Sequence, residues 1–339
     1  MIEFEILARG LYRPDQVAIT YDPSLRMPTT PAIQHWMDAL WQQKLASAQQ
    51  EGYPLYESQL FRFVHAESWH EEREGDRAFR DRFLRLRRGG GGVVDGWGPS
   101  WSPASSSPQA HRLSPPGPRP RPYERDDLSP KIPISEREDK LHLVLGDTSY
   151  KEYTTTRVPE FAQGRSRQEL SNALAVCSVI ETSDGSILYE RRRKVAVYVG
   201  RYHVIGGFFE RDLDTSATNP DPFAAIRREI REETGIQAAD IAEQHCLGVV
   251  YDVATPHAEV CFLTRLCIPL NEVHQRVPED DEIQQLLSLY VTEESLRDFI
   301  LTNHGNISAT GEPNLLLYGA VKFGERWFEE MMARLVATT

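Results

Sequence analysis

The chain has 339 residues, 40% of them hydrophobic, which is enough for a core in two domains or in one domain with appendages. Its formal net charge of -12 excludes a general nucleic-acid binder, which needs a basic surface, but allows a small phosphorylated ligand held through a metal ion. The N-terminus lacks the apolar core of a signal peptide, and no run approaches the ~20 apolar residues of a membrane span. We therefore expect no membrane partner and a cytoplasmic location, with the nucleus as the alternative.

The N-terminal part is predicted to form a small α+β domain, whose first section covers residues 1–86. A helix is predicted over residues 31–50, because Thr30 is a suitable N-cap and Pro31 fits the first helical position. Apolar side chains recur along this segment at helical spacing and predict a buried face: Ile33, Trp36, Met37, Leu40, Trp41 and Leu45.

Residues 87–130 differ in composition from both flanks. They contain the glycine run Gly89–Gly92 and a stretch rich in Pro, Ser and Arg with few aliphatic side chains. Such a segment cannot bury enough apolar surface to offset the entropy of ordering, so we expect a disordered insert, either functional or translated intron sequence. Residues 131–165 are expected to complete the N-terminal domain and to connect it to a second domain over residues 166–339.

From residue 141 onward, strands are predicted around one strong helix. The strand candidates cover residues 141–145, 172–180, 186–192, 195–199, 248–253 and 259–268. Asp184-Gly185 is a hairpin turn signal between two of them. Helices are expected over residues 221–234 and about 314–335. Strands in mixed order around a central helix favour an α/β/α sandwich with a mixed sheet over a regular βαβ repeat.

The helix over residues 221–234 carries three carboxylates on one face. Asp221 is a good N-cap, and Gly235 suits a left-handed C-cap. Glu229, Glu232 and Glu233 fall at i, i+3 and i+4, so they are neighbours that repel one another. They favour a site for a hard divalent cation, which takes oxygen ligands; a solvated face balanced by nearby arginines is the alternative.

The sequence around this helix resembles the Nudix box. Arg228-Glu229-Ile230-Arg231-Glu232-Glu233-Thr234-Gly235-Ile236 matches the second half of that box, and Gly206-Gly207-Phe208-Phe209-Glu210 resembles its beginning. The resemblance implies that residues 166–339 form a Nudix domain that binds Mg²⁺, with Mn²⁺ as the alternative. It implies Glu229, Glu232, Glu233 and the Gly207 carbonyl as metal ligands, and Arg228 as the side chain that orients a glutamate by a bidentate salt bridge.

The loop inside the box departs from the family pattern. A glutamate would be expected at position 213, where this chain has Leu213. The arginine would be expected at 221 but is Arg228, so the loop is longer by 228 minus 221, or seven residues. The candidates for the missing carboxylate are Asp212, Asp214 and Asp221.

The chemistry implied is metal-assisted hydrolysis of a diphosphate, in which a carboxylate takes a proton from water. Glu232 or Glu233 is the first candidate for the base, and Glu259 in a strand is the second, since in some relatives the base lies outside the box. Weaker candidates for contacts to the substrate are Tyr202, Phe208 and Glu210; the alternative for the aromatic residues is packing in the core.

A second resemblance narrows the substrate. Leu145-Gly146-Asp147-Thr148-Ser149-Tyr150-Lys151-Glu152-Tyr153 is similar to a segment that precedes the Nudix domain in the eukaryotic UDP-glucose and UDP-galactose diphosphatase family. That family also has a longer loop in its box. The resemblance implies hydrolysis of a UDP-sugar to UMP and a sugar 1-phosphate. An ADP-ribose or dinucleotide diphosphatase and a catalytically silent nucleotide sensor are the alternatives. The sequence carries no sign of an oligomeric state.

Overall fold

The computed structural model describes residues 2–52, 55–70, 139–192, 197–216, 219–279 and 285–337. The insert predicted over residues 87–130 lies outside these ranges. Met1–His70 and Glu138–Thr339 together form one compact unit. None of the helices in these ranges combines the length and the apolar character needed to cross a bilayer.

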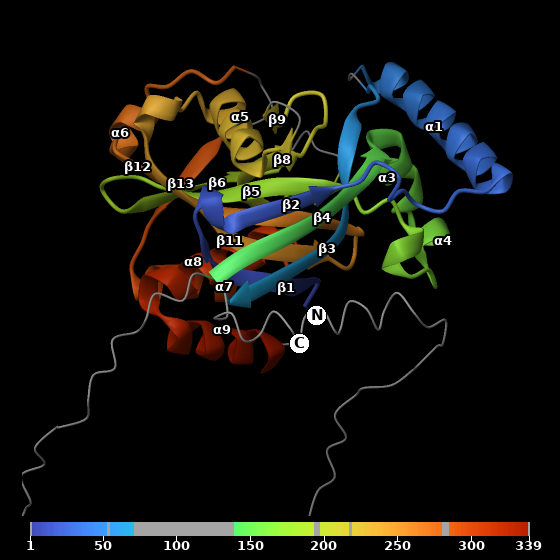
Figure 1. Ribbon diagram of the computed structural model, residues 1–339. Coiled ribbons are helices and arrows are strands. Elements are labelled where there is room, and N and C mark those ends of the chain that lie inside the picture. The colour runs from blue at the N-terminus through green and yellow to red at the C-terminus, as the bar shows by residue number, and fades with distance from the viewer. Residues whose placement is uncertain are drawn as a thin grey trace, which may run out of the picture. The chain divides into compact units, whose positions relative to one another are not determined.

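The centre of this unit is a mixed sheet that has eight strands in the described residues (Figure 1). Its order is β1-β11-β12-β5-β6-β13, with β8 also paired to β5 and β7 also paired to β6. The pair β12 and β5 is parallel, and the other pairs are antiparallel. The strands are β1 (Phe4–Tyr12), β5 (Leu174–Glu181), β6 (Ser186–Arg191), β7 (Tyr202–His203), β8 (Ile205–Phe208), β11 (Ile241–Asp252), β12 (His257–Leu266) and β13 (Leu286–Tyr290).

Helices cover both faces of this sheet. On one face, apolar side chains of α7 (Glu293–Asn303), α8 (Gly311–Phe323) and α9 (Glu325–Ala337) pack against alternate residues of the strands. The other face is covered by α5 (Pro222–Thr234) and by a small sheet in the order β2-β4-β3. Figure 1 shows α5 and α8 on opposite sides of the strands. The arrangement is the predicted α/β/α sandwich with a mixed sheet.

The small sheet and the helices beside it come from the N-terminal part of the chain. Its strands are β2 (Val17–Tyr21), β3 (Gln59–His70) and β4 (Asp139–Ser149). Next to them lie α1 (Pro31–Glu51), α3 (Tyr150–Thr156) and α4 (Pro159–Ala162). Strand β1 does not join this sheet, because it pairs with β11. We predicted that the residues before 166 form a separate N-terminal domain. Strand β1 belongs instead to the main sheet, together with strands from the second predicted domain. Two short strands, β9 (Thr215–Ser216) and β10 (Asn219–Pro220), pair within the loop before α5.

Several local predictions are confirmed. Helix α1 begins after Thr30, whose side chain accepts a hydrogen bond from the Ile33 amide. Of its predicted buried face, Met37 and Trp41 are buried and the other four side chains are half-buried. The turn at Asp184-Gly185 joins β5 to β6, and Gly185 adopts φ 86°, which glycine tolerates best.

Two predicted elements are wrong. The predicted strand over residues 195–199 is a bend and turn at Val197–Val199, the part of it that is described, and Tyr198 has φ 56°. The Tyr198 hydroxyl donates to Asp252 at 2.7 Å, so this residue anchors a turn instead of extending a strand. The single C-terminal helix is two helices, α8 and α9, because Gly324 at φ 95° interrupts the helical backbone.

Candidate active site

Helix α5 positions the three predicted carboxylates. The Asp221 side chain accepts hydrogen bonds from the amides of Phe223 and Ala224, at 3.0 and 2.9 Å, and so caps the N-terminus. Gly235 ends the helix at φ 73°. The buried apolar side chains of α5, Phe223, Ile226 and Ile230 among them, pack against the sheet. Capping and packing together fix the rotation of the helix, and therefore the direction of its acidic face.

Arg228 is the centre of the polar network on that face. Its Nε and Nη2 donate to the two carboxylate oxygens of Asp214, both at 2.8 Å. Its Nη1 lies 2.9 Å from Glu229 Oε1 and 3.0 Å from Glu232 Oε2. Burial lowers the pKa of the guanidinium, but the hydrogen bonds with Asp214 and the charge of Glu229 outweigh it and raise that pKa. Arg228 therefore stays charged, and its guanidinium group holds three carboxylates around it.

The long loop supplies the carboxylate that is missing at position 213. Asp214 has 1% of its side chain exposed and also accepts a hydrogen bond from the Glu210 amide at 2.8 Å. Asp221 is occupied as the helix cap, and Asp212 is exposed. Of the three candidates, Asp214 is thus the one that pairs with the arginine.

Gly207 lies directly against Glu229. It pairs with Val176 across the β8–β5 ladder, and a Cβ built on Gly207 would overlap the carboxylate of Glu229. Arg228 Nη2 also donates to the carbonyl of Phe208 at 3.0 Å. The second glycine of the turn is therefore required by the close approach of Glu229, and the arginine ties α5 to β8.

The donor chemistry of this face suits a divalent cation. Glu210 and Asp214 add carboxylates to the three on α5. Burial raises the pKa of Glu210; Arg228 opposes this shift, whereas the charges of Asp214 and Glu232 add to it. Within the described residues, however, no group of three Asp, Glu, His or Cys side chains is arranged to hold a metal ion. Arg228 stands between Glu229 and Glu232, so holding a cation requires these side chains to turn toward it.

Glu259 is separated from this network by the sheet. Val260 and Phe262 of β12 pack on the α5 face, whereas Cys261 and Leu263 pack on the α8 face. Because side chains alternate along a strand, Glu259 points to the α8 face, where it accepts a hydrogen bond from Thr310 at 2.9 Å. The structure therefore does not bring this candidate base to the α5 carboxylates.

Glu259 instead forms a buried ion pair with His257. The His257 Nε2 lies 3.1 Å from Glu259 Oε1. Burial alone would raise the pKa of Glu259, but the hydrogen bond with His257 lowers that pKa to about 2. Burial would lower the pKa of His257, but Tyr153 and Glu259 raise it to about 10. Both groups are charged at neutral pH, so Glu259 is a poor proton acceptor there.

The three weaker substrate candidates lie in different places. Tyr202 packs against Tyr189 and Phe299 of α7, on the face opposite α5. Glu210 lies next to Arg228, as described above. Phe208 belongs to an aromatic cluster beside the glycine turn, with its ring centroid 5.6 Å from Tyr150 and 5.2 Å from Tyr153. The structure thus brings Phe208 and Glu210 to the α5 site and leaves Tyr202 away from it.

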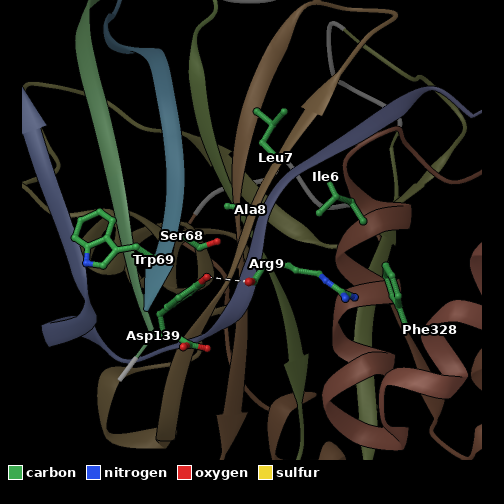
Figure 2. Close-up of a pocket in the computed structure, with 9 residues that line it drawn as sticks. Ile6, Leu7, Ala8, Arg9, Ser68, Trp69, Asp139 and Phe328 are labelled. Atoms are coloured by element: carbon green, nitrogen blue, oxygen red, sulfur yellow. Dashed lines mark hydrogen bonds between the residues drawn. The ribbon is translucent and has the colours of Figure 1, made fainter. Parts of the chain in front are cut away.

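A cavity with a volume of about 600 Å³ lies elsewhere, between β1 and β3. Figure 2 shows Arg9 and Leu7 of β1 on one side of it and Trp69 of β3 on the other. Arg9 is already engaged by Glu325 and by the ring of Phe328, with its guanidinium carbon 4.6 Å from the ring centroid. The cavity contains no cluster of carboxylates, and none of its lining residues comes from α5 or the glycine turn.

Neither the protein-family models nor the curated proteins contain a match to this chain. Solved structures similar to it include DR0079 from Deinococcus radiodurans, with 19% identity, a TM-score of 0.30, and coverage of 43% of this chain and 80% of that one. Another is the MutT protein from Methanosarcina mazei Go1, with 20% identity, a TM-score of 0.29, and coverage of 46% and 93%. A bifunctional NMN adenylyltransferase/ADP ribose pyrophosphatase from Francisella tularensis, complexed with AMP and a Mn ion, has 16% identity, a TM-score of 0.31, and coverage of 44% and 41%.

Proposed function

We propose that this chain is a metal-dependent diphosphatase of the Nudix type, which hydrolyses a nucleoside diphosphate linked to another group. The observation that carries the proposal is the network on α5. Arg228 fixes Asp214 while Glu229 and Glu232 lie around the same guanidinium, with Glu229 against Gly207. A buried cation surrounded by this many carboxylates is costly to maintain for stability alone. Arg228, Glu229, Glu232 and Gly207 match the Nudix box, and Asp214 of the longer loop completes the network.

The residues of this site have separate roles in the proposed reaction. Glu229, Glu232, Glu233 and the carbonyl of Gly207 would hold Mg²⁺ or Mn²⁺, which when bound neutralises the diphosphate and activates water. Arg228 positions Glu229 and Glu232, and Asp214 in turn fixes Arg228. The Glu232 side chain is 28% exposed, against 11% for Glu229, while Glu233 is buried. Glu232 is therefore the carboxylate best placed to receive a proton from water.

For the substrate, we propose a UDP-sugar, cleaved to UMP and a sugar 1-phosphate. The support is the segment Leu145 to Tyr153, which is similar to a segment of UDP-sugar diphosphatases. Its two tyrosines, Tyr150 and Tyr153, pack on Phe208, and the Phe208 carbonyl accepts a hydrogen bond from Arg228. The segment is thus adjacent to the proposed metal face. Stacking of a base on such rings is a common mode of nucleotide recognition.

The test is a panel of four diphosphates with Mg²⁺: UDP-glucose, UDP-galactose, ADP-ribose and NADH. We expect phosphomonoester release from the two UDP-sugars and loss of that release in Glu232→Gln. The control is Glu330→Gln, an exposed residue of α9, in which release should be normal. Turnover of ADP-ribose without UDP-sugars would contradict the substrate assignment. Nucleotide binding with no turnover of any of the four would favour the silent sensor.

A further inference from the structure

Glu232, the most exposed of the three carboxylates on α5, lies between two arginines. Its Oε2 is 3.0 Å from Nη1 of Arg228, and its Oε1 is 3.2 Å from Nη2 of Arg231. Each oxygen of this carboxylate therefore contacts a different guanidinium group. A divalent cation has to compete with both arginines for Glu232, because like charges near the same oxygens repel one another.

Arg231 also pairs with a second carboxylate, that of Glu279. Its Nε lies 3.0 Å from Oε1 and 3.1 Å from Oε2 of Glu279, whereas its Nη2 makes the contact with Glu232. Arg231 thus joins two carboxylates through separate nitrogens of one guanidinium fork. When Glu232 turns away, Arg231 keeps Glu279, and its charge stays paired.

The backbone around Glu279 is attached to the C-terminal end of α5. The Glu279 amide donates to the carbonyl of Glu232 at 2.8 Å, which gives a partner to one of the last carbonyls of the helix. Gly235 lies so close to the same segment that an added Cβ would be 2.3 Å from the carbonyl oxygen of Val277. Glu279 therefore contacts α5 through its backbone at Glu232 and through its side chain at Arg231.

The same segment is also anchored where it begins. It follows α6 (Leu270–Val273), whose Val273 is buried in the same apolar cluster as the inner face of α5. Figure 1 shows both helices on the same side of the strands. Arg276 donates to both carboxylate oxygens of Asp240, at 2.9 and 2.5 Å. The carboxylate of Glu279 is thus presented to α5 by a segment that is held along its length.

We propose that Arg231 and Glu279 are positioning residues that control how readily Glu232 turns from the arginines to a metal ion. This inference rests on the proposed function and adds two residues to its site. Arg231 holds Glu232 while the metal is absent, and Glu279 keeps the charge of Arg231 paired when Glu232 turns. Without Glu279, the guanidinium attracts Glu232 more strongly, so a cation competes with a tighter contact.

Net charge alone gives a different expectation for Glu279. Removal of any carboxylate near a metal site weakens cation binding, whatever that carboxylate contacts. This direct effect persists when Arg231 is absent, whereas an effect transmitted through Arg231 disappears with it. A double-mutant cycle over Arg231 and Glu279 therefore separates the two explanations.

The experiment measures the affinity of the full chain for Mn²⁺ without nucleotide, from the EPR signal of the free ion. The variants are Glu279→Gln, Arg231→Gln and the double variant. Glu272→Gln is the matched control, because it removes the same charge from an exposed residue of α6, just before the same segment. The Arg231 and Glu279 side chains are 42% and 49% exposed, so each variant should fold, and thermal unfolding checks this.

We expect Glu279→Gln to weaken Mn²⁺ binding about threefold, which is the size expected for the loss of one exposed ion pair. In the Arg231→Gln background, the same substitution should change the affinity by less than about 1.5-fold. Glu272→Gln should leave the affinity of the wild type unchanged. An equal loss from Glu279→Gln in both backgrounds, or no loss in either, overturns the positioning role.

Turnover of the four diphosphates in Mg²⁺, measured on the same variants, separates this inference from the proposed function. A loss of Mn²⁺ affinity that depends on Arg231, without turnover of any diphosphate, supports the positioning pair and removes the enzymatic assignment. Turnover in Mg²⁺, with an equal loss of Mn²⁺ affinity in both backgrounds, supports the enzyme and removes the positioning pair.

Discussion

Replacing Asp214 with asparagine should destabilise the fold and impair the active site together. Asp214 is 1% exposed and accepts both hydrogen bonds of the Arg228 fork, while the Arg228 side chain is 13% exposed. Removing one partner of a buried ion pair typically costs ~3–5 kcal/mol. Arg228 keeps Glu229 and Glu232 as neighbours, so we expect about 3 kcal/mol, at the low end of that range. This is a large part of the ~5–15 kcal/mol by which most domains are stable.

The assay is urea unfolding of the wild type and of Asp214→Asn, read as the midpoint at an unchanged slope. Asp212→Asn is the matched control, because Asp212 is exposed two residues away, and its free energy of unfolding should stay within ~0.5 kcal/mol of the wild type. Turnover of the Asp214 variant should fall by roughly 10–100-fold, as is usual when a supporting partner of a metal ligand is removed. A loss below ~1 kcal/mol, or an equal loss in Asp212→Asn, would show that Asp214 does not hold the arginine.

Gly207→Ala should keep the fold but lose most turnover and metal affinity, because the added methyl overlaps the Glu229 carboxylate; unchanged metal binding in calorimetry would contradict this. Burial lowers the pKa of His203 to about 3, so the stability it contributes is fully present above pH 6.5 and is lost as the pH falls toward 3. His203→Gln should therefore flatten the acid side of the stability curve, whose slope for one proton is at most about 1.4 kcal/mol per pH unit, and a curve identical to the wild type would refute it. Glu259→Gln should lower the unfolding temperature, while the fraction that stays folded keeps its turnover. Glu232→Gln should abolish turnover and leave the fold intact. Equal loss of turnover in both variants would show that Glu259 takes part in the mechanism.

The helix α5 could be predicted because its signals are local. The cap at Asp221, the left-handed Gly235 and the spacing of Glu229, Glu232 and Glu233 all lie within one short segment. Asp214 could be proposed but not distinguished from its neighbours. Its role depends on how the long loop folds back onto Arg228, through contacts between residues 14 positions apart.

The position of Glu259 could not be predicted for a different reason. The alternation along β12 predicts that Glu259 and Val260 face opposite ways, but which face α5 covers is decided by tertiary packing. The same limit applies to β1, whose pairing with β11 joins residues more than 200 positions apart in the sequence. The break between α8 and α9, in contrast, could have been predicted from the sequence. Gly324 is a single glycine within an apolar helical pattern, which is a local signal for the end of a helix.

We propose that the carboxylates of α5 support metal-dependent cleavage of a nucleotide diphosphate. The most direct measurement is phosphorus NMR of UDP-glucose incubated with the purified chain, with Mg²⁺ and with EDTA, for the wild type and Glu229→Gln. We predict conversion to UMP and glucose 1-phosphate only in the wild type with Mg²⁺. Conversion in EDTA, or undiminished conversion by Glu229→Gln, would contradict the account.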